Sequence, residues 1–128
     1  MAQIIVPAQE AIAVLRANLQ SAPIIRSMDV TINGPRLGLK VAPILPVMYV
    51  VIRFQSYNYP TAQFALEGMP ANLNVGALVQ LPPGIAIQGG MLAINTDTLL
   101  RGQLGLKGLR VTAFGWDGAA YHIQTEAA

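Results

Sequence analysis

Hydrophobic residues at the start of the chain recur with the spacing of an amphipathic helix. Pro7 suits a first helical turn, because the N–H that proline lacks is not needed there. Four apolar residues then fall on one helical face: Ala8, Ile12, Leu15 and Leu19. Pro23 ends this pattern, so the sequence predicts a helix that begins at Pro7 and buries one side.

The next apolar residues alternate with polar ones, which is typical of a strand. The alternation reaches Asn33-Gly34, a pair that tolerates positive φ at both central positions of a type I′ turn. This two-residue loop predicts a hairpin in which Val30 lies opposite Leu37 and Met28 lies opposite Leu39.

A second unit repeats the order of helix and hairpin. A helix-like run, Ala71–Leu81, is closed by Pro82-Pro83-Gly84, and Gly89-Gly90 marks the next tight turn. The two-glycine loop sets two apolar pairs opposite each other: Ile87 with Leu92, and Ile85 with Ile94.

A third unit ends the chain. Thr96 or Asp97 is expected to cap a short helix that runs to Leu104. The last hairpin turns at Trp116-Asp117-Gly118, and a three-residue loop keeps its apolar residues on one face better than a two-residue loop does. The pairs predicted by this bulged turn are Ala113 with Tyr121 and Val111 with Ile123.

Another strand pair, Val47–Gln55 and Thr61–Glu67, lies between the first and second units. The connection contains Tyr59-Pro60, a candidate for a cis peptide bond. The face predicted to point inward consists of Met48, Val50, Ile52, Phe54, Ala62, Phe64 and Leu66. The face predicted to point outward consists of Tyr49, Val51, Arg53, Gln55, Gln63 and Glu67.

These patterns predict one α+β domain spanning residues 1–128. Its sheet is mostly antiparallel, with about eight short strands in hairpins and three short helices. The N-terminal amphipathic helix is expected to pack on the sheet.

The chain contains more apolar residues than is usual for a fold of this size. The chain is 53% hydrophobic and only 11% charged, where about 25% charged residues are usual for globular proteins. So much apolar surface exceeds the needs of a small core, which points to a partner subunit, an apolar ligand or a membrane surface. The eight cations are scattered singly and the net charge is only +2, so no nucleic-acid partner is expected.

Targeting signals and cysteine chemistry are not visible in the sequence. The first residues lack the basic region of a secretory signal, and no apolar run is long enough to span a bilayer, so the cytoplasm is the default compartment. The chain contains no cysteine, which excludes disulfides and thiolate chemistry.

Catalytic residues are equally hard to find. His122 is the only imidazole, and the sequence places neither a nucleophile nor an orienting carboxylate beside it. The six carboxylates lie at positions typical of helix ends, turns and strand faces, and their spacing suggests neither a metal cluster nor an acid/base pair. They are Glu10, Asp29, Glu67, Asp97, Asp117 and Glu126. We expect no enzyme activity, no metal and no cofactor.

Aromatic residues gather near two hairpin tips, with Tyr57 and Tyr59 at one and Phe114 and Trp116 at the other. They either pack locally across the turns or contact a bilayer interface or a partner chain. Under the second interpretation they form an interface with the outward Tyr49 and Val51, and the apolar run from Ile4 to Val6 adds to it.

The C-terminal half contains a distinctive series of turns and strands: Leu81–Ile94, with its Pro-Pro-Gly and Gly-Gly turns, Thr98-Leu99-Leu100, Gly108–Val111 and Asp117-Gly118. This series resembles the closing segment of LmeA-like proteins. LmeA-like proteins are bacterial envelope proteins of the tubular lipid-binding type, in which a curved antiparallel sheet wraps a helix. The resemblance implies an apolar groove lined by Met48, Val50, Ile52, Phe54, Phe64, Leu92 and Ile94. The same residues would also form an ordinary filled core.

Taken together, these features predict a non-enzymatic module that binds an apolar or amphipathic, lipid-like ligand in a groove between sheet and helix. Self-association into a homo-oligomer is expected as well, because unpaired strand edges and sparse charge favour pairing with another chain. The alternative is a structural subunit of a homo-oligomeric assembly that holds no small ligand.

Overall fold

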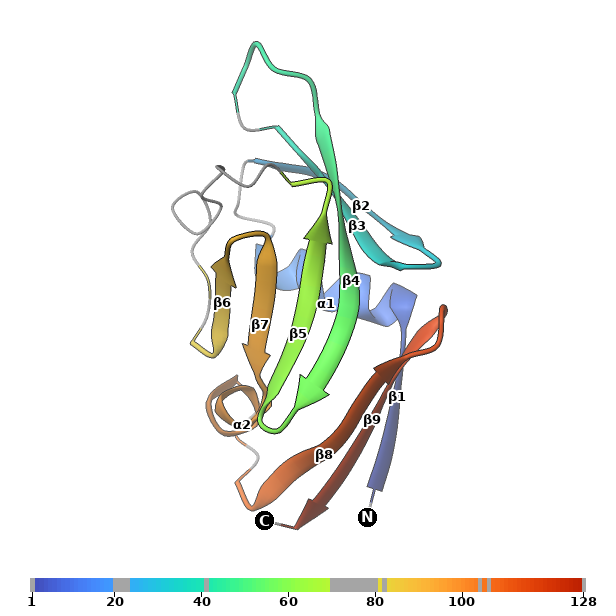
Figure 1. Cartoon of the computed structure of the whole chain (residues 1–128), viewed down its shortest axis with the longest axis vertical. Coiled ribbons are helices and arrows are strands. Elements are labelled where there is room, and N and C mark those ends of the chain that lie inside the picture. Colours follow the sequence, from blue (N-terminus) through green and yellow to red (C-terminus); the bar gives the residue numbers. More distant parts are fainter. Residues whose placement is uncertain are drawn as a thin grey trace.

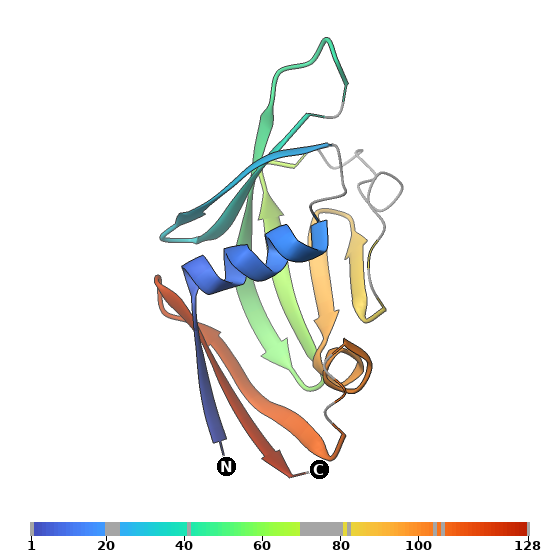
Figure 2. The same ribbon diagram turned by 180° about the vertical axis from the view of Figure 1, so that it is seen from behind.

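The chain folds into two antiparallel sheets, with one long helix lying across a face of the larger sheet (Figure 1; Figure 2). The computed structural model describes residues 2–19, 24–40, 42–69, 81, 83–103, 105 and 107–127. Within these ranges the strands are β1 (Ala2–Pro7), β2 (Ile25–Thr31), β3 (Gly34–Leu39), β4 (Met48–Asn58), β5 (Thr61–Glu67), β6 (Ile85–Gln88), β7 (Met91–Asn95), β8 (Leu109–Trp116) and β9 (Ala120–Ala127). The helices are α1 (Ala8–Leu19) and α2 (Thr96–Thr98), and α2 continues into a short π-helical segment, η2 (Leu99–Gln103).

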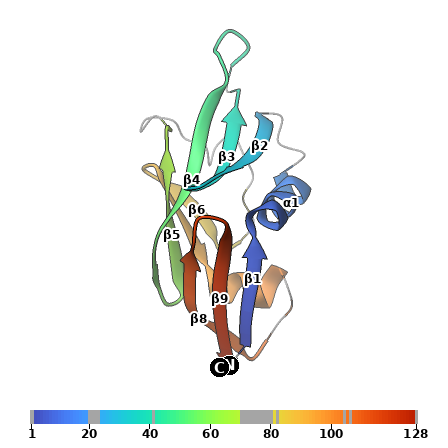
Figure 3. The same ribbon diagram turned by 90° about the vertical axis from the view of Figure 1, so that its right-hand side faces the viewer.

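The larger sheet has the strand order β2-β3-β4-β5-β7-β6, and the smaller sheet has the order β1-β9-β8. Every described strand pair is antiparallel. Figure 3 shows α1 and β1 on the same side of β4 and β5. The two sheets meet where β8 packs against β4. The predicted α+β class with antiparallel sheets is therefore confirmed.

The predicted numbers of elements are wrong, because the described residues form nine strands and two helices. The additional strand is β1, which pairs along its whole length with the last strand, β9. Pro7 closes β1, and the helix begins at Ala8 instead. Of the second predicted helix, Ala71–Leu81, all but Leu81 lies outside the described residues.

The first predicted helix agrees with the structure more closely than the third does. In α1, Ala8 and Ile12 are buried and Leu15 is half-buried, which agrees with the predicted apolar face. In the third unit the cap is Asn95, not Thr96 or Asp97, and its Oδ1 accepts a hydrogen bond from the Thr98 N–H at 3.1 Å. The predicted end of that helix, at position 104, lies outside the described residues.

The central hairpin of β4 and β5 agrees with the sequence prediction. The inward residues Val50, Ile52 and Phe64 are buried, and they lie on the predicted face. All outward residues are exposed apart from Val51, which is half-buried. The Tyr59–Pro60 peptide bond in the connection is cis, as proposed.

The hairpin of β6 and β7 also has the predicted register. Ile85 lies opposite Ile94, and Ile87 lies opposite Leu92. Gly89 has a φ of +58° in the turn, a conformation that favours glycine. Here the turn residues and the alternation of apolar residues specify the same pairing.

The register predicted for β2 and β3 is wrong by two residues. Met28 lies opposite Leu37, and the two loop residues are Ile32 and Asn33. Gly34 is instead the first residue of β3, with a φ of +138°, and a Cβ atom there would lie 2.1 Å from the Ile52 carbonyl oxygen. Because a shift of two keeps each side chain on its face, the apolar side of this hairpin is preserved.

The register predicted for β8 and β9 is also wrong. Trp116 lies opposite Tyr121, and Phe114 lies opposite Ile123, with a bulge between Val111 and Ala113. The turn is longer than predicted because Oδ1 of Asp117 accepts hydrogen bonds from the N–H groups of the two residues that precede Tyr121. The longer turn brings the aromatic residues of both strands onto one face.

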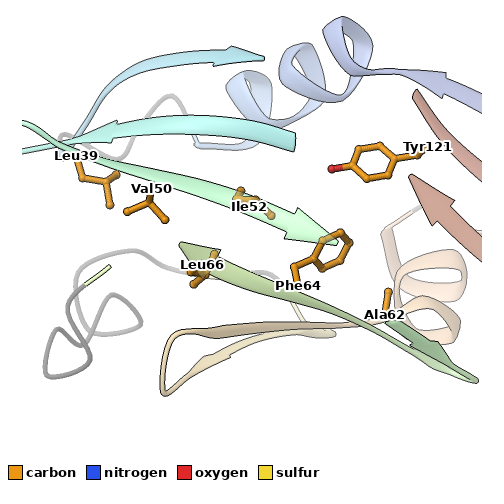
Figure 4. Packing of buried hydrophobic residues seen from close by; sticks show 7 residues of the cluster. All are labelled: Leu39, Val50, Ile52, Ala62, Phe64, Leu66 and Tyr121. Atoms are coloured by element: carbon orange, nitrogen blue, oxygen red, sulfur yellow. The ribbon is translucent and has the colours of Figure 1, made fainter. Parts of the chain in front are cut away.

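That face completes the hydrophobic core, whose buried residues are Leu39, Val50, Ile52, Ala62, Phe64, Leu66 and Tyr121. Figure 4 shows Val50 and Ile52 from β4, Phe64 from β5 and Tyr121 from β9 around the same interior. The core thus depends on side chains from both sheets.

Gly34→Ala tests the close approach of β3 to β4. We expect a loss of more than about 3 kcal/mol of unfolding free energy, since an L residue is strained at this φ and its Cβ would collide with backbone. The matched variant Gly89→Ala should cost only about 1 kcal/mol, because nothing lies within 4 Å of that Cβ position. Urea unfolding measures both, and equal losses would contradict the assigned contact.

Candidate functional site

The seven residues predicted to line a groove lie together on the inner side of the larger sheet. Val50, Ile52 and Phe64 are buried, and Phe54, Leu92 and Ile94 pack against them. Met48, at the start of β4, is half-buried. Mutual packing of this kind accounts for these side chains as a filled core, and their role in holding a ligand stays a prediction.

Phe114 lies at the centre of an aromatic cluster that joins the two sheets. Its ring centroid is 5.4 Å from that of Phe54 and 5.6 Å from that of Tyr121. Trp116 contacts Tyr121 at 4.7 Å, and its Nε1–H donates a hydrogen bond to the Ile32 carbonyl at 2.8 Å. Phe114 and Trp116 are half-buried and have partners inside the chain, and their part in an interface stays a prediction.

Tyr57 belongs to the same internal contact. Its hydroxyl donates to the Val111 carbonyl oxygen at 2.7 Å and lies 3.1 Å from Oγ1 of Thr96. That Oγ1 in turn donates to the Pro60 carbonyl at 3.0 Å. Burial raises the pKa of the Tyr57 phenol. The Tyr57 hydroxyl links β4 to β8, and the part of this half-buried residue in an interface stays a prediction.

Tyr59 and Tyr49 remain on the surface, as expected of interface residues. Tyr59 is 52% exposed and its hydroxyl donates to Asp97, which raises the pKa of the phenol. Tyr49 is 55% exposed and lies under the guanidinium of Arg36, 5.1 Å from the ring centroid. Their part in an interface stays a prediction, as does that of the half-buried Val51.

A histidine and a carboxylate do meet, although sequence patterns do not predict this pair. Nε2 of His122 lies 2.6 Å from Oδ2 of Asp117. This contact and the two backbone N–H groups of the turn lower the pKa of Asp117 to about 2. The residues opposite His122 on the adjoining strands are Ile5 and Gly115, and neither carries a nucleophile. The longer β8–β9 turn is what brings the pair together.

The described residues form neither a cluster of metal ligands nor a membrane-spanning helix. No group of three or more His, Asp or Glu side chains there is arranged to hold a metal ion. No helix in the described ranges has the length and hydropathy needed to cross a bilayer.

The loop between β3 and β4, at the top of Figure 1, carries the large hydrophobic side chain with the highest exposed fraction among the described residues. Ile44 is 93% exposed and Leu45 is 44% exposed, and each is flanked by a proline, Pro43 or Pro46. The segment directly precedes the predicted strand Val47–Gln55. An Ile-Leu pair between prolines, which cannot join a strand interior, is the signal that could have identified the exposed tip.

Cations without carboxylate partners lie at the base of this loop. Four arginines form ion pairs, at positions 36, 53, 101 and 110. Among the described residues the other four cations have no such partner: Arg16, Arg26, Lys40 and Lys107. Of these, Arg26 and Lys40 lie at the end of the β2–β3 ladder next to the loop, where the Lys40 N–H donates to the Ile24 carbonyl at 2.8 Å.

The strand β1 is the second exposed apolar segment. Ile4 is 46% exposed and Ile5 is 55% exposed, and they lie on opposite faces of the strand. Within the described ranges β1 pairs only with β9, so its other edge is open. The predicted apolar run from Ile4 to Val6 therefore lies at a sheet edge.

Comparison of the chain with protein-family models, with curated proteins and with solved structures finds no match in any of the three. The resemblance to LmeA-like proteins therefore stays a prediction. The proposals about function depend on the two exposed apolar segments, which are the β3–β4 loop and β1.

Tyr57→Phe tests the hydrogen bond that joins the two sheets. We expect a loss of about 1 to 2 kcal/mol of unfolding free energy, because the variant leaves the partly buried Val111 carbonyl without its donor. Tyr59→Phe removes an exposed hydroxyl and should change stability by less than about 0.5 kcal/mol. Chemical unfolding of both variants makes the comparison, and a neutral Tyr57→Phe would refute the proposed role.

Asp117→Asn tests the charge in the last turn. A folded pKa of about 2 lies below the usual value of 3.8, so the carboxylate stabilises the fold above about pH 4. This contribution is lost as the pH falls from about 4 to about 2, and the Asn variant, which keeps an acceptor, should show a shallower fall in Tm over that interval. The control Glu10→Gln, at an exposed carboxylate, should retain the wild-type profile.

Proposed function

We propose that the protein is a non-enzymatic module that binds an anionic lipid surface through the loop between β3 and β4. The observation that carries the proposal is the exposure of Ile44, which is 93% in the loop between β3 and β4. A side chain of this kind has no stabilising role in the isolated chain, since apolar burial is the main source of stability. It gains free energy only when a partner covers it.

The shape of the loop favours a fluid partner. The backbone is turned by a hydrogen bond from the Leu45 N–H to the Ala42 carbonyl at 3.1 Å, and Pro43 and Pro46 restrict it further. The apolar tip projects from the fold instead of lying flat on it (Figure 1). A bilayer accommodates a projecting apolar group by insertion at the headgroup boundary, whereas a rigid protein would need a matching cavity.

The charge near the loop favours an anionic headgroup region. No charged residue lies between Lys40 and Arg53, so nothing in the tip opposes insertion. Arg26 and Lys40 lie behind it without carboxylate partners among the described residues. Tyr49 is exposed on the same end of β4, and such amphipathic rings favour the membrane interface.

The expected binding is weak and reversible. Burial of Ile44 contributes about 2 to 3 kcal/mol and the partial burial of Leu45 about 1 kcal/mol. Each cation near an anionic surface adds about 1 kcal/mol. The total of roughly 5 kcal/mol resembles the binding of a single myristoyl chain, with an association constant of about 10⁴ M⁻¹.

The internal lipid site predicted from the sequence is a separate proposal. It requires the inner side chains, Val50 and Phe64 among them, to make room for a ligand. Organic extraction of the purified protein followed by lipid mass spectrometry tests it, and recovery of no lipid would exclude a resident ligand without bearing on the loop. The default compartment, the cytoplasm, is compatible with contact at an inner membrane surface.

Ile44→Ser tests the lipid-binding loop by co-sedimentation with vesicles of phosphatidylcholine and phosphatidylglycerol. We expect the association constant to fall by about 10- to 100-fold, as loss of about 1.5 to 3 kcal/mol of apolar burial requires. The matched control is Ile32→Ser, which removes a 77% exposed isoleucine from a different turn and should bind as the wild type does.

A double variant tests whether the two cations behind the loop contribute to vesicle binding. The double substitution Arg26→Gln and Lys40→Gln should abolish the preference for anionic vesicles over phosphatidylcholine alone. If Ile44→Ser binds vesicles as tightly as Ile32→Ser, the loop is not the contact and the proposal fails.

A further inference from the structure

The open edge of β1 presents an alternating set of unpaired backbone groups. The Ala8 N–H donates to the Ala119 carbonyl at 2.9 Å, which fixes the phase of the β1–β9 ladder. Because hydrogen-bonded pairs alternate along an antiparallel ladder, the even-numbered residues of β1 direct their backbone groups at β9. Gln3 and Ile5 direct theirs at the open edge. Pro7 adds a carbonyl there but has no N–H, so only two residues offer both groups.

We propose that this edge pairs with the same edge of a second copy of the chain, antiparallel, with Ile4 opposite Ile4 of the other copy. In this register Gln3 of each copy exchanges both backbone hydrogen bonds with Ile5 of the other, which makes four bonds. A shift by two residues that sets Ile5 opposite Ile5 also gives four bonds, but each Gln3 is then opposite Pro7, which accepts one bond and cannot return it because proline has no N–H. The two smaller sheets then become one six-stranded sheet.

Side chains support the same register. Ile4 lies opposite Ile123 within one copy, and Ile123 lies opposite Phe114. The pairing extends this row across the joint, so that four isoleucines lie side by side between two phenylalanines. Cross-strand apolar pairs of this kind stabilise sheets. The exposed side chain of Ile4 is thereby covered.

The chemistry of the strand favours a second copy over another protein. Ala2–Pro7 contains no charged residue, so a two-fold axis brings no like charges together. Edge strands that avoid pairing usually carry lysine or another charge, and this one carries none. A two-fold contact between identical edges closes on itself and yields a dimer, whereas pairing with a different edge would give an open chain.

This contact is independent of the lipid-binding loop, since β1 lies at the opposite end of the fold (Figure 1). The experiments therefore separate the two proposals. Ile44→Ser should leave the dimer intact, and loss of the dimer should leave binding of each copy to vesicles in place.

Disulfide trapping tests the register. Because the sequence contains no cysteine, an introduced cysteine can form a disulfide only with its copy in the other chain. Opposed Ile4 residues form a non-hydrogen-bonded pair with Cα atoms about 4.5 Å apart, so Ile4→Cys should give a covalent dimer on mild oxidation. Ile5→Cys is the matched control. Its two Cα atoms would be about 8 Å apart, beyond the roughly 7 Å that a disulfide can bridge.

Analytical ultracentrifugation tests the association itself. The wild-type chain should sediment as a dimer and Ile4→Lys as a monomer, because it sets like charges directly opposite each other. Ile32→Lys, at an exposed position in the β2–β3 turn and outside the paired edge, should remain a dimer. Circular dichroism checks that each variant is folded. A monomeric wild type, or equal cross-linking at positions 4 and 5, overturns the proposal.

Discussion

The contact of Phe114 with the larger sheet is the interaction on which the rest of the structure depends. Among the described strands no backbone hydrogen bond of a ladder links the two sheets, so side chains hold them together. Phe114 contacts Phe54 and Phe64 of the larger sheet at ring-centroid distances of 5.4 and 5.9 Å, and it packs on Tyr121 of its own sheet at 5.6 Å. The Tyr57 hydroxyl adds a directional bond to the β8 backbone. Burial at this joint raises the pKa of Tyr121 to about 12, which reflects how little water reaches it.

Sequence reasoning succeeded where local signals decide the structure and failed where distant contacts do. The register of β6 and β7 follows from Gly89-Gly90 and the flanking alternation, and both signals are local. Asn33-Gly34 carries an equally strong turn signal, yet Gly34 is needed where β3 approaches the Ile52 carbonyl, so the turn moves by one residue. The strand β1 was not predicted because its one partner among the described strands, β9, is at the other end of the chain.

Distant contacts also decide which of the candidate surface residues pack against the core. The inner faces absorb most of the apolar surplus, including two aromatic residues assigned to an interface from their position near a turn. Position in the sequence could not reveal that Phe114 and Trp116 point inward, because their face depends on the length of the Asp117 turn. Among the described residues nine large hydrophobic side chains remain exposed, and the two proposed contacts depend on those of the β3–β4 loop and of β1.

The two proposed contacts constrain each other through symmetry. An antiparallel pair of β1 strands is related by a two-fold axis perpendicular to the strands, so the second copy is reversed end for end. The loop that carries Ile44 lies beyond the end of β1 that leads into α1 (Figure 1). Paired copies therefore direct their loops in opposite directions, and one flat bilayer cannot receive both. A dimer would gain avidity from its two loops only between two facing lipid surfaces, whereas on a single surface it binds as weakly as one copy does.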